Sequence, residues 1–161
     1  MIDGPIGITN THSVGTVRDT FVSWMVDQGW PAPWHAPVVA ETYDGALNDI
    51  NGQHVEPTHV LSALQTAAAG PVREGSVGGG TGMLCNGFKG GIGTASRVVS
   101  AAGRLFTVGV LVQCNYNWEG KSLRLGDQWV SKKLPVGEHC YADDTIAPKN
   151  PWFPFCSGAE L

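Results

Sequence analysis

The chain has 161 residues, of which 42% are hydrophobic and 15% charged, a balance that suits one globular domain with a core and excludes an intrinsically disordered chain. The formal net charge is −4 and no run of lysine or arginine occurs, so nucleic acid and membrane surfaces are not expected partners. Nothing resembles a secretory signal, and the four cysteines lack zinc-ribbon spacing; we expect a cytoplasmic protein with small buried thiols, although a disulfide between two of them stays open.

The first 28 residues predict a strand followed by a helix. Residues 1–9 are apolar and β-branched, which indicates a strand that leads into a polar turn at residues 10–13. From residue 14 to residue 28, apolar side chains recur at three- and four-residue steps, as is typical of an amphipathic helix. Thr11 or Ser13 can cap the start of this helix, and Gly29 can close its end.

A loop and a second strand come next. Three prolines within residues 30–37 forbid a helix and favour an extended surface loop, whose Trp34 either walls a pocket or packs against the body. Residues 38–43 predict a strand that puts Glu41 and Tyr43 on the same face. A carboxylate and a phenol beside a turn form either a polar site or a hydrogen-bonded surface pair.

A second amphipathic helix is predicted over residues 57–69. Pro57 suits its first position, and the Gly-Pro pair at residues 70–71 ends it. His54 and His59 flank its start, but they lack partner cysteines or a matching acidic pattern, so no metal site is predicted there.

Glycine dominates the middle of the chain. Ten of the 22 glycines lie between Gly70 and Gly93, interleaved with apolar residues, which indicates a folded loop and not a linker. The P-loop pattern fails because Gly90 follows Lys89, and the dinucleotide pattern fails because Ser96 replaces the third glycine or alanine. We therefore expect these glycines to shape the fold and to bind no nucleotide.

Residues 104–113 are apolar on both alternating faces. As a strand this segment must be covered on both sides, which indicates a layered α/β core. We expect the two helices to pack on the sheet that contains it. Residues 123–130 predict a hairpin, and residues 135–161, rich in proline and aromatic residues, predict an irregular tail on an otherwise single domain.

The chain resembles the L-aminopeptidase/D-amino-acid esterase family, which includes the β-aminopeptidases, in four ordered segments: ITNTHSVGTVRD (8–19), VVAETYDGALNDI (38–50), EGSVGGGTGMLCNGFKGGIGTASRVV (74–99) and TVGVLVQCN (107–115). The resemblance implies an α/β fold that is an incomplete part of a four-layer α/β/β/α sandwich, like that of N-terminal nucleophile hydrolases. Such enzymes remove N-terminal residues from peptides, amides or esters, after autoproteolysis of a precursor exposes a nucleophilic serine.

The resemblance also implies roles for individual residues. Asn115 in LVQCN corresponds to an oxyanion-binding asparagine, and Tyr43 in AETYDG to a tyrosine beside the nucleophile. Glu41 corresponds to a glutamate that receives the amino group of the substrate. The chemistry is coherent, because amide and phenol groups donate to an oxyanion and a carboxylate pairs with an ammonium. Tyr43 and Asn115 are thus the catalytic candidates, Glu41 and Trp34 the substrate-binding candidates, and no cofactor or metal is expected.

The chain departs from the family in two places. The family has a segment before ITNTHSVG, and after the asparagine it reaches a Ser-Ile-Ile-Val strand that begins with the nucleophile; Ser157 lacks that context. We expect an internal portion of the first subunit, inactive alone, whose partners are a peptide or amino-acid amide substrate, a second subunit with the nucleophilic serine, and further copies in an oligomer. A non-catalytic structural or interaction fragment is the alternative, and an oxidoreductase that uses the glycine segment is the weakest hypothesis.

Overall fold

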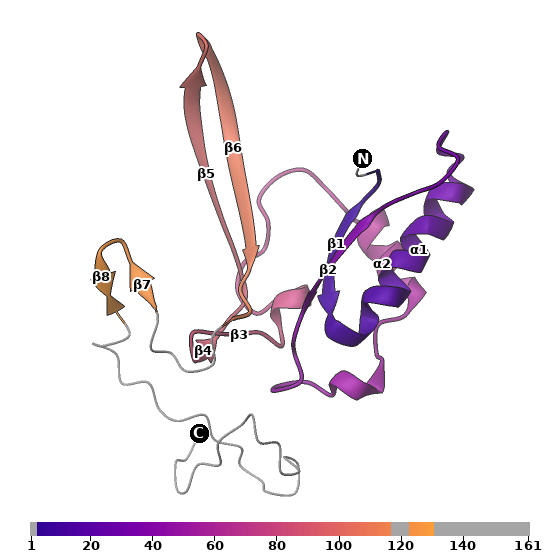
Figure 1. Ribbon diagram of the computed structural model, residues 1–161, viewed down its shortest axis with the longest axis horizontal. Helices are drawn as coiled ribbons and strands as arrows, with labels where there is room; N and C mark the ends of the chain where they lie inside the picture. The colour runs from indigo at the N-terminus through magenta and orange to yellow at the C-terminus, as the bar shows by residue number, and fades with distance from the viewer. Residues whose placement is uncertain (1–2, 117–122, 131–161) are drawn as a thin grey trace, which may run out of the picture. The chain divides into compact units, whose positions relative to one another are not determined.

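A computed structural model of the chain describes residues 3–116 and 123–130 (Figure 1). It divides the chain into two units, one formed by Met1–Leu84 with Lys89–Asn115 and the other by Cys85–Phe88 with Tyr116–Leu161. Both described α-helices and the two longest described strands belong to the first unit.

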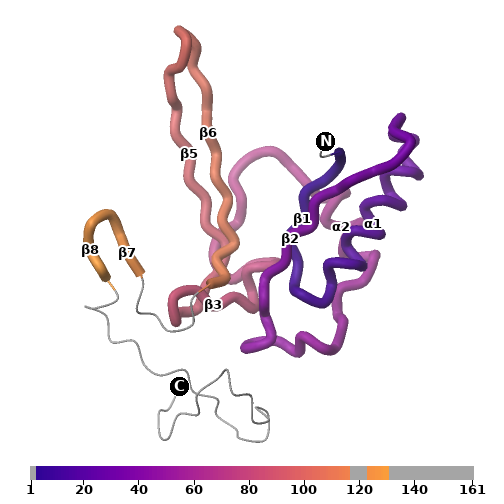
Figure 2. Tube along the Cα trace, viewed as in Figure 1, coloured from indigo at the N-terminus to yellow at the C-terminus, as the bar shows by residue number. Residues whose placement is uncertain are grey.

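The first unit contains a parallel pair of strands covered by helices on one face. β1 (Ile6–Asn10) pairs with β2 (Val38–Thr42), with Ile6 opposite Val38 and Asn10 opposite Thr42. Helices α1 (Val14–Asp27) and α2 (Pro57–Gln65) lie on the same side of this pair (Figure 2). Their core consists of three buried residues, Val17, Phe21 and Val60, with Val39 of β2 packed against it. The helices and β2 therefore share one apolar core.

Both predicted helices form, but α2 ends at Gln65, before the predicted end at residue 69. Pro57 stands at the first position of α2, where the backbone N–H of Glu56 donates to Nδ1 of His59 at 3.0 Å. Ser13 is the N-cap residue of α1 but forms no capping bond with its side chain, and the hydroxyl of Thr11 donates instead to Glu41. Short 3₁₀ helices cover Thr11–Ser13 (η1), Ile50–Gly52 (η2) and Gly78–Gly80 (η3). Neither described helix is long and apolar enough to cross a bilayer.

The predicted strand at 104–113 forms, but its predicted packing is wrong. β6 (Arg104–Gln113) pairs in antiparallel register with β5 (Ile92–Ala101), and residues 104–112 are exposed on both faces. Instead α1 packs on β1 and β2, and α2 packs against α1. The reason is connectivity: α1 is the crossover between β1 and β2, so it packs back on the sheet made by those two strands.

The short strands complete the description. β3 (Leu84–Cys85) pairs with β4 (Phe88–Lys89). In the second unit β7 (Arg124–Leu125) and β8 (Gln128–Trp129) form the predicted hairpin, with Gly126 at φ 57° in its turn. The predicted irregular tail at 135–161 lies outside the described residues.

Two of the cysteines differ from the prediction. Cys85 and Cys114 are each disulfide-bonded, so the prediction of small buried thiols is wrong for both. Cys140 and Cys156 lie outside the described residues.

Candidate active site

The side chain of Asn115 is held against the backbone of Tyr43. Its Oδ1 accepts a hydrogen bond from the Tyr43 N–H at 2.8 Å, and its Nδ2 donates to the Tyr43 carbonyl, also at 2.8 Å. A primary amide offers the same donor and acceptor as a peptide group, so Asn115 takes the place of a neighbouring strand. These two bonds join the end of β2 to the end of β6 across 72 positions of sequence.

Gln113 forms a second cross-link two residues earlier. Its Nε2 donates to the Thr42 hydroxyl at 2.7 Å, and this hydroxyl donates to the Thr9 carbonyl at 3.4 Å. Gln113 also lies against Gly79, where a Cβ atom would collide with its amide group. Gln113 ends β6 and Asn115 follows two residues later, so two side chains at this end of the strand reach Thr42 and Tyr43.

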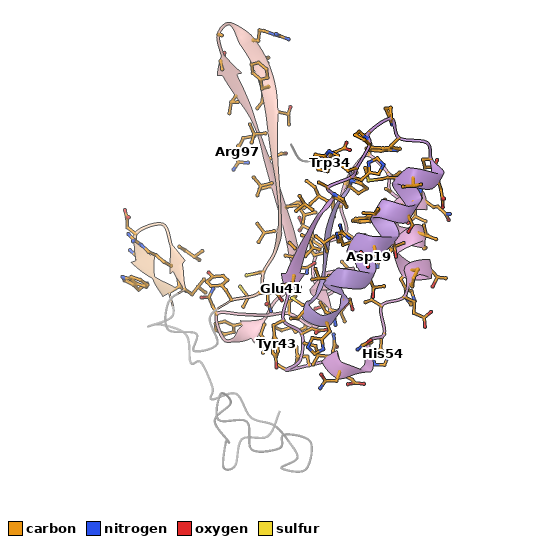
Figure 3. All side chains as sticks on the ribbon, turned by 45° about the vertical axis from the view of Figure 1, so that its right-hand side comes forward. Asp19, Trp34, Glu41, Tyr43, His54 and Arg97 are labelled. Carbon is orange, nitrogen blue, oxygen red and sulfur yellow. The ribbon has the colours of Figure 1, made fainter. Side chains whose placement is uncertain are left out.

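Glu41 lies near the end of β2, two residues before Tyr43 (Figure 3). It is exposed, and its Oε2 accepts a hydrogen bond from the Thr11 hydroxyl at 2.7 Å. The described residues bring no lysine, arginine or histidine to this carboxylate, which can therefore accept a cation from outside.

Trp34 is not brought to the other three candidates. It lies in the loop before β2, at the opposite end of this strand from Glu41 and Tyr43 (Figure 3). Trp34 is 62% exposed. In this chain Trp34 thus does not face the position that Tyr43 and Asn115 share.

The glycine segment is shaped by close contacts between backbones. A Cβ atom at Gly80 would lie 2.8 Å from the Gly75 carbonyl oxygen and 3.0 Å from the Ile92 nitrogen. Gly75 and Ile92 exchange both of their backbone hydrogen bonds, at 2.8 and 2.9 Å. Only residues without side chains allow the chain to cross itself so closely, which supports a shape role for this segment.

Two charged side chains hold this segment in place. Nζ of Lys89 donates to the carbonyls of Gly80 and Gly90 at 3.1 and 2.9 Å, and burial lowers the pKa of Lys89. Glu74 accepts hydrogen bonds from the hydroxyl and backbone N–H of Thr94, which lower the pKa of Glu74. The ammonium group of Lys89 thus binds carbonyl groups of the glycine segment and stabilises the conformation of this loop.

A cavity of about 1080 Å³ lies along β1 in the first unit. Asp44 and Asn10 line it, and each has a buried Oδ1 atom that finds no hydrogen-bond partner among the described residues. His54 and His59 also line it; His54 contacts Asp49 at 3.1 Å and His59 accepts the helix N-cap bond. Within the described part of the chain, no three metal-binding side chains gather.

The predicted candidates did not include Gln113, Thr42 or Thr11. The signal for Gln113 was present, because a polar residue in an otherwise apolar strand stands two positions before Asn115. Thr42 and Thr11 gave no comparable signal, since their partners are distant in sequence and threonine is common in strands and turns.

Comparison with known proteins shows how this arrangement is related to others. The profile of peptidase family S58 matches residues 1–147. The chain belongs to this family. It is 61% identical over 137 residues to the β-peptidyl aminopeptidase BapA of Sphingosinicella microcystinivorans, covering 83% of this chain and 35% of that protein. The BapA of Sphingosinicella xenopeptidilytica is 47% identical over 137 residues, covering 81% of this chain and 33% of that protein.

Solved structures of aminopeptidases also match the chain. The L-aminopeptidase D-Ala-esterase/amidase of Ochrobactrum anthropi, described as a variant of the Ntn hydrolase fold, matches with a TM-score of 0.74 and 51% identity, over 81% of this chain and 37% of that one. A Burkholderia sp. β-aminopeptidase matches with a TM-score of 0.71 and 54% identity, over 80% of this chain and 36% of that one. The chain therefore spans about a third of the length of the relatives it matches.

Proposed function

We propose that this chain is the first-subunit portion of a serine-type aminopeptidase of the N-terminal nucleophile class. The complete enzyme removes N-terminal residues from peptides, amides or esters, and a second subunit supplies the nucleophilic serine. The observation that carries this proposal is the pair of 2.8 Å hydrogen bonds that fix the Asn115 amide against Tyr43.

Asn115 acts as an oxyanion donor. Its Nδ2 carries two hydrogens, and the bond to the Tyr43 carbonyl uses one of them. The amide cannot rotate without losing both of its bonds to Tyr43, so the second N–H keeps a fixed direction. Donors that are fixed before the reaction stabilise a developing oxyanion without reorganisation.

Tyr43 supplies the second candidate polar group, its phenol, which lies over Gly45. A Cβ atom at Gly45 would lie 2.7 Å from the Tyr43 hydroxyl oxygen, so the phenol folds closely over this glycine. The backbone of Tyr43 is fixed by Asn115 and its ring by Gly45, which suits a phenol that acts beside a nucleophile.

Glu41 provides selectivity for a free amino group. Its carboxylate is exposed and already oriented by Thr11, and a substrate ammonium can bind to it with a charge-assisted hydrogen bond. This accounts for removal of N-terminal residues in preference to internal cleavage. The role of Trp34 as a wall of the substrate pocket stays a prediction.

The architecture supports this function as half of a four-layer α/β/β/α sandwich. Helix α1 covers one face of the β1–β2 pair, whereas on its other face Ile6 and Ile8 are 72% and 41% exposed. A second sheet that packs about 10 Å away would cover such a face.

The test uses variants of Asn115 in a reconstituted enzyme. The chain is expressed with the part of the 61%-identical S. microcystinivorans relative that it lacks, and hydrolysis of an L-amino-acid p-nitroanilide is measured. Asn115→Ala and the volume-conserving Asn115→Asp each lower kcat about 100-fold while KM changes little.

The matched control is Asn51→Ala, at an exposed asparagine outside the site, which leaves kcat unchanged. Equal kcat values for the wild-type chain and both Asn115 variants would contradict the proposed role. An inactive but fully associated wild-type pair would instead favour the non-catalytic alternative.

A further inference from the structure

The side chain of Gln113 links the last paired residue of β6 to the last residue of β2. In the β5–β6 ladder the final pair is Gln113 with Ile92, so Asn115, two positions later, lies beyond this ladder. Nε2 of Gln113 donates to the Thr42 hydroxyl at 2.7 Å. Gln113 therefore connects the paired part of β6 to β2 directly before the chain reaches Asn115.

Thr42 extends this link to β1. Its hydroxyl accepts the hydrogen bond from Gln113 and donates to the Thr9 carbonyl at 3.4 Å. Thr42 and Thr9 are both buried, where hydrogen bonds are stronger and the loss of a partner costs more than at the surface. A single row of hydrogen bonds thus joins β6, β2 and β1 at the residue that precedes Tyr43.

Gln113 and Asn115 bind consecutive residues at the end of β2. Gln113 binds Thr42, and Asn115 binds both backbone groups of Tyr43. One attachment alone would let the end of β6 pivot about it, whereas two attachments on neighbouring residues fix its orientation as well. A functional group has to be held within about 0.5 Å of its working geometry, which requires supporting contacts of this kind.

Gly79 of the glycine segment leaves room for the Gln113 amide. A Cβ atom at position 79 would overlap Oε1 of Gln113 and would lie 3.1 Å from its Nε2. The φ angle of Gly79 is not in the left-handed region, so its backbone suits any residue, and the displaced atoms are the end of a flexible side chain. An alanine at this position therefore moves the Gln113 amide away from Thr42 at little cost in stability.

We propose that Gln113 is a positioning residue for Asn115 and Tyr43, and that the lack of a side chain at Gly79 lets the Gln113 amide reach Thr42. In this role Gln113 acts through the Thr42 hydroxyl and not on the substrate. The inference rests on the proposed function, because it names a residue that orients the oxyanion donor of the same site.

A double-mutant cycle tests the coupling in the reconstituted enzyme. The chain is combined with the complementary part of the S. microcystinivorans relative, and hydrolysis of an L-amino-acid p-nitroanilide is measured. Gln113→Ala and Gly79→Ala each lower kcat about tenfold while KM changes little, because the substrate still binds but the donor is misplaced. In the Gln113→Ala background Gly79→Ala has no further effect, since the amide that it displaces is already absent. Additive losses overturn the proposal, as does an unchanged kcat in either single variant.

Two comparisons separate positioning from a loss of stability. Thr42→Val removes the hydroxyl that Gln113 binds and lowers kcat as Gln113→Ala does, whereas Thr42→Ser keeps this hydroxyl and most of kcat. Gly93→Ala, whose Cβ atom meets nothing within 4 Å, leaves kcat unchanged. Urea unfolding measures the folded fraction of each variant. Equal kcat values for Thr42→Val and Thr42→Ser overturn the proposal, as does a fall in kcat of Gly79→Ala that only follows its folded fraction.

Hydrogen exchange in the 161-residue chain alone separates this inference from the proposed function. The Nδ2 hydrogen of Asn115 that binds the Tyr43 carbonyl is followed by its side-chain amide signal in ¹H–¹⁵N NMR spectra. Its exchange is about tenfold faster in Gln113→Ala and in Gly79→Ala, because both loosen the end of β6, and is unchanged in Gly93→Ala. Faster exchange in both variants together with an inactive wild-type pair contradicts the aminopeptidase alone. Unchanged exchange in both variants contradicts the positioning role, whatever the rate of hydrolysis.

Discussion

At the scale of single residues, the proposed function gives Asn115 both a structural and a chemical role. Its amide binds both backbone groups of Tyr43, and one Nδ2 hydrogen is left for the reaction. The motif LVQCN predicted the asparagine as a donor. Its attachment to Tyr43 could not be predicted, because no local pattern relates two residues 72 positions apart. Side-chain contacts of this kind depend on tertiary structure.

A second prediction for a single residue concerns the stability effect of Asp44. This carboxylate is buried with one hydrogen bond, from Asn48, and no cation from the described residues. Asp44→Asn keeps its shape and removes its charge, so the free energy of unfolding of the isolated chain rises by about 1 to 2 kcal/mol in urea titrations. Asp49→Asn, at a side chain that is 66% exposed, serves as the control and changes it little. A loss of stability in Asp44→Asn would show that the carboxylate is already compensated.

At the scale of elements, periodicity predicted which segments form helices and strands better than it predicted which elements pack together. The strand at 104–113 and the starts of α1 and α2 agree with the structure. β5 was not predicted, because its first residues belong to the glycine-rich segment, which reads as a loop. The helices were assigned to the wrong sheet because the parallel pairing of β1 with β2 leaves no mark on local sequence.

The glycine segment allows a paired test. Gly80→Ala introduces a Cβ atom 2.8 Å from the Gly75 carbonyl oxygen, so the backbone must shift and the free energy of unfolding falls by about 1 to 3 kcal/mol. Gly93→Ala is the matched control, because its Cβ atom meets nothing within 4 Å. Urea unfolding of both variants measures the difference. Equal changes in the free energy of unfolding for the two variants would show that close backbone contact does not require a glycine at position 80.

At the scale of the whole molecule, the described part of the chain carries exposed apolar side chains on two of its strands. Ile6 on β1 and Leu105, Val108 and Val110 on β6 are each at least 50% exposed. Exposed apolar faces of this kind mark sites of association. Residues 104–113 predicted a strand that is covered on both faces, whereas residues 104–112 are exposed, and no local pattern identifies a segment that would cover them.

The central claim is that this chain supplies the oxyanion-binding part of an aminopeptidase whose nucleophile lies on another segment. The most direct test measures p-nitroaniline release from an L-amino-acid p-nitroanilide by the purified chain, by the complementary part of the S. microcystinivorans relative, and by the two together. We predict release by the combined polypeptides only, because an oxyanion donor without its nucleophile leaves little catalysis. Robust release by the 161-residue chain alone, unchanged in Asn115→Ala, would contradict the account.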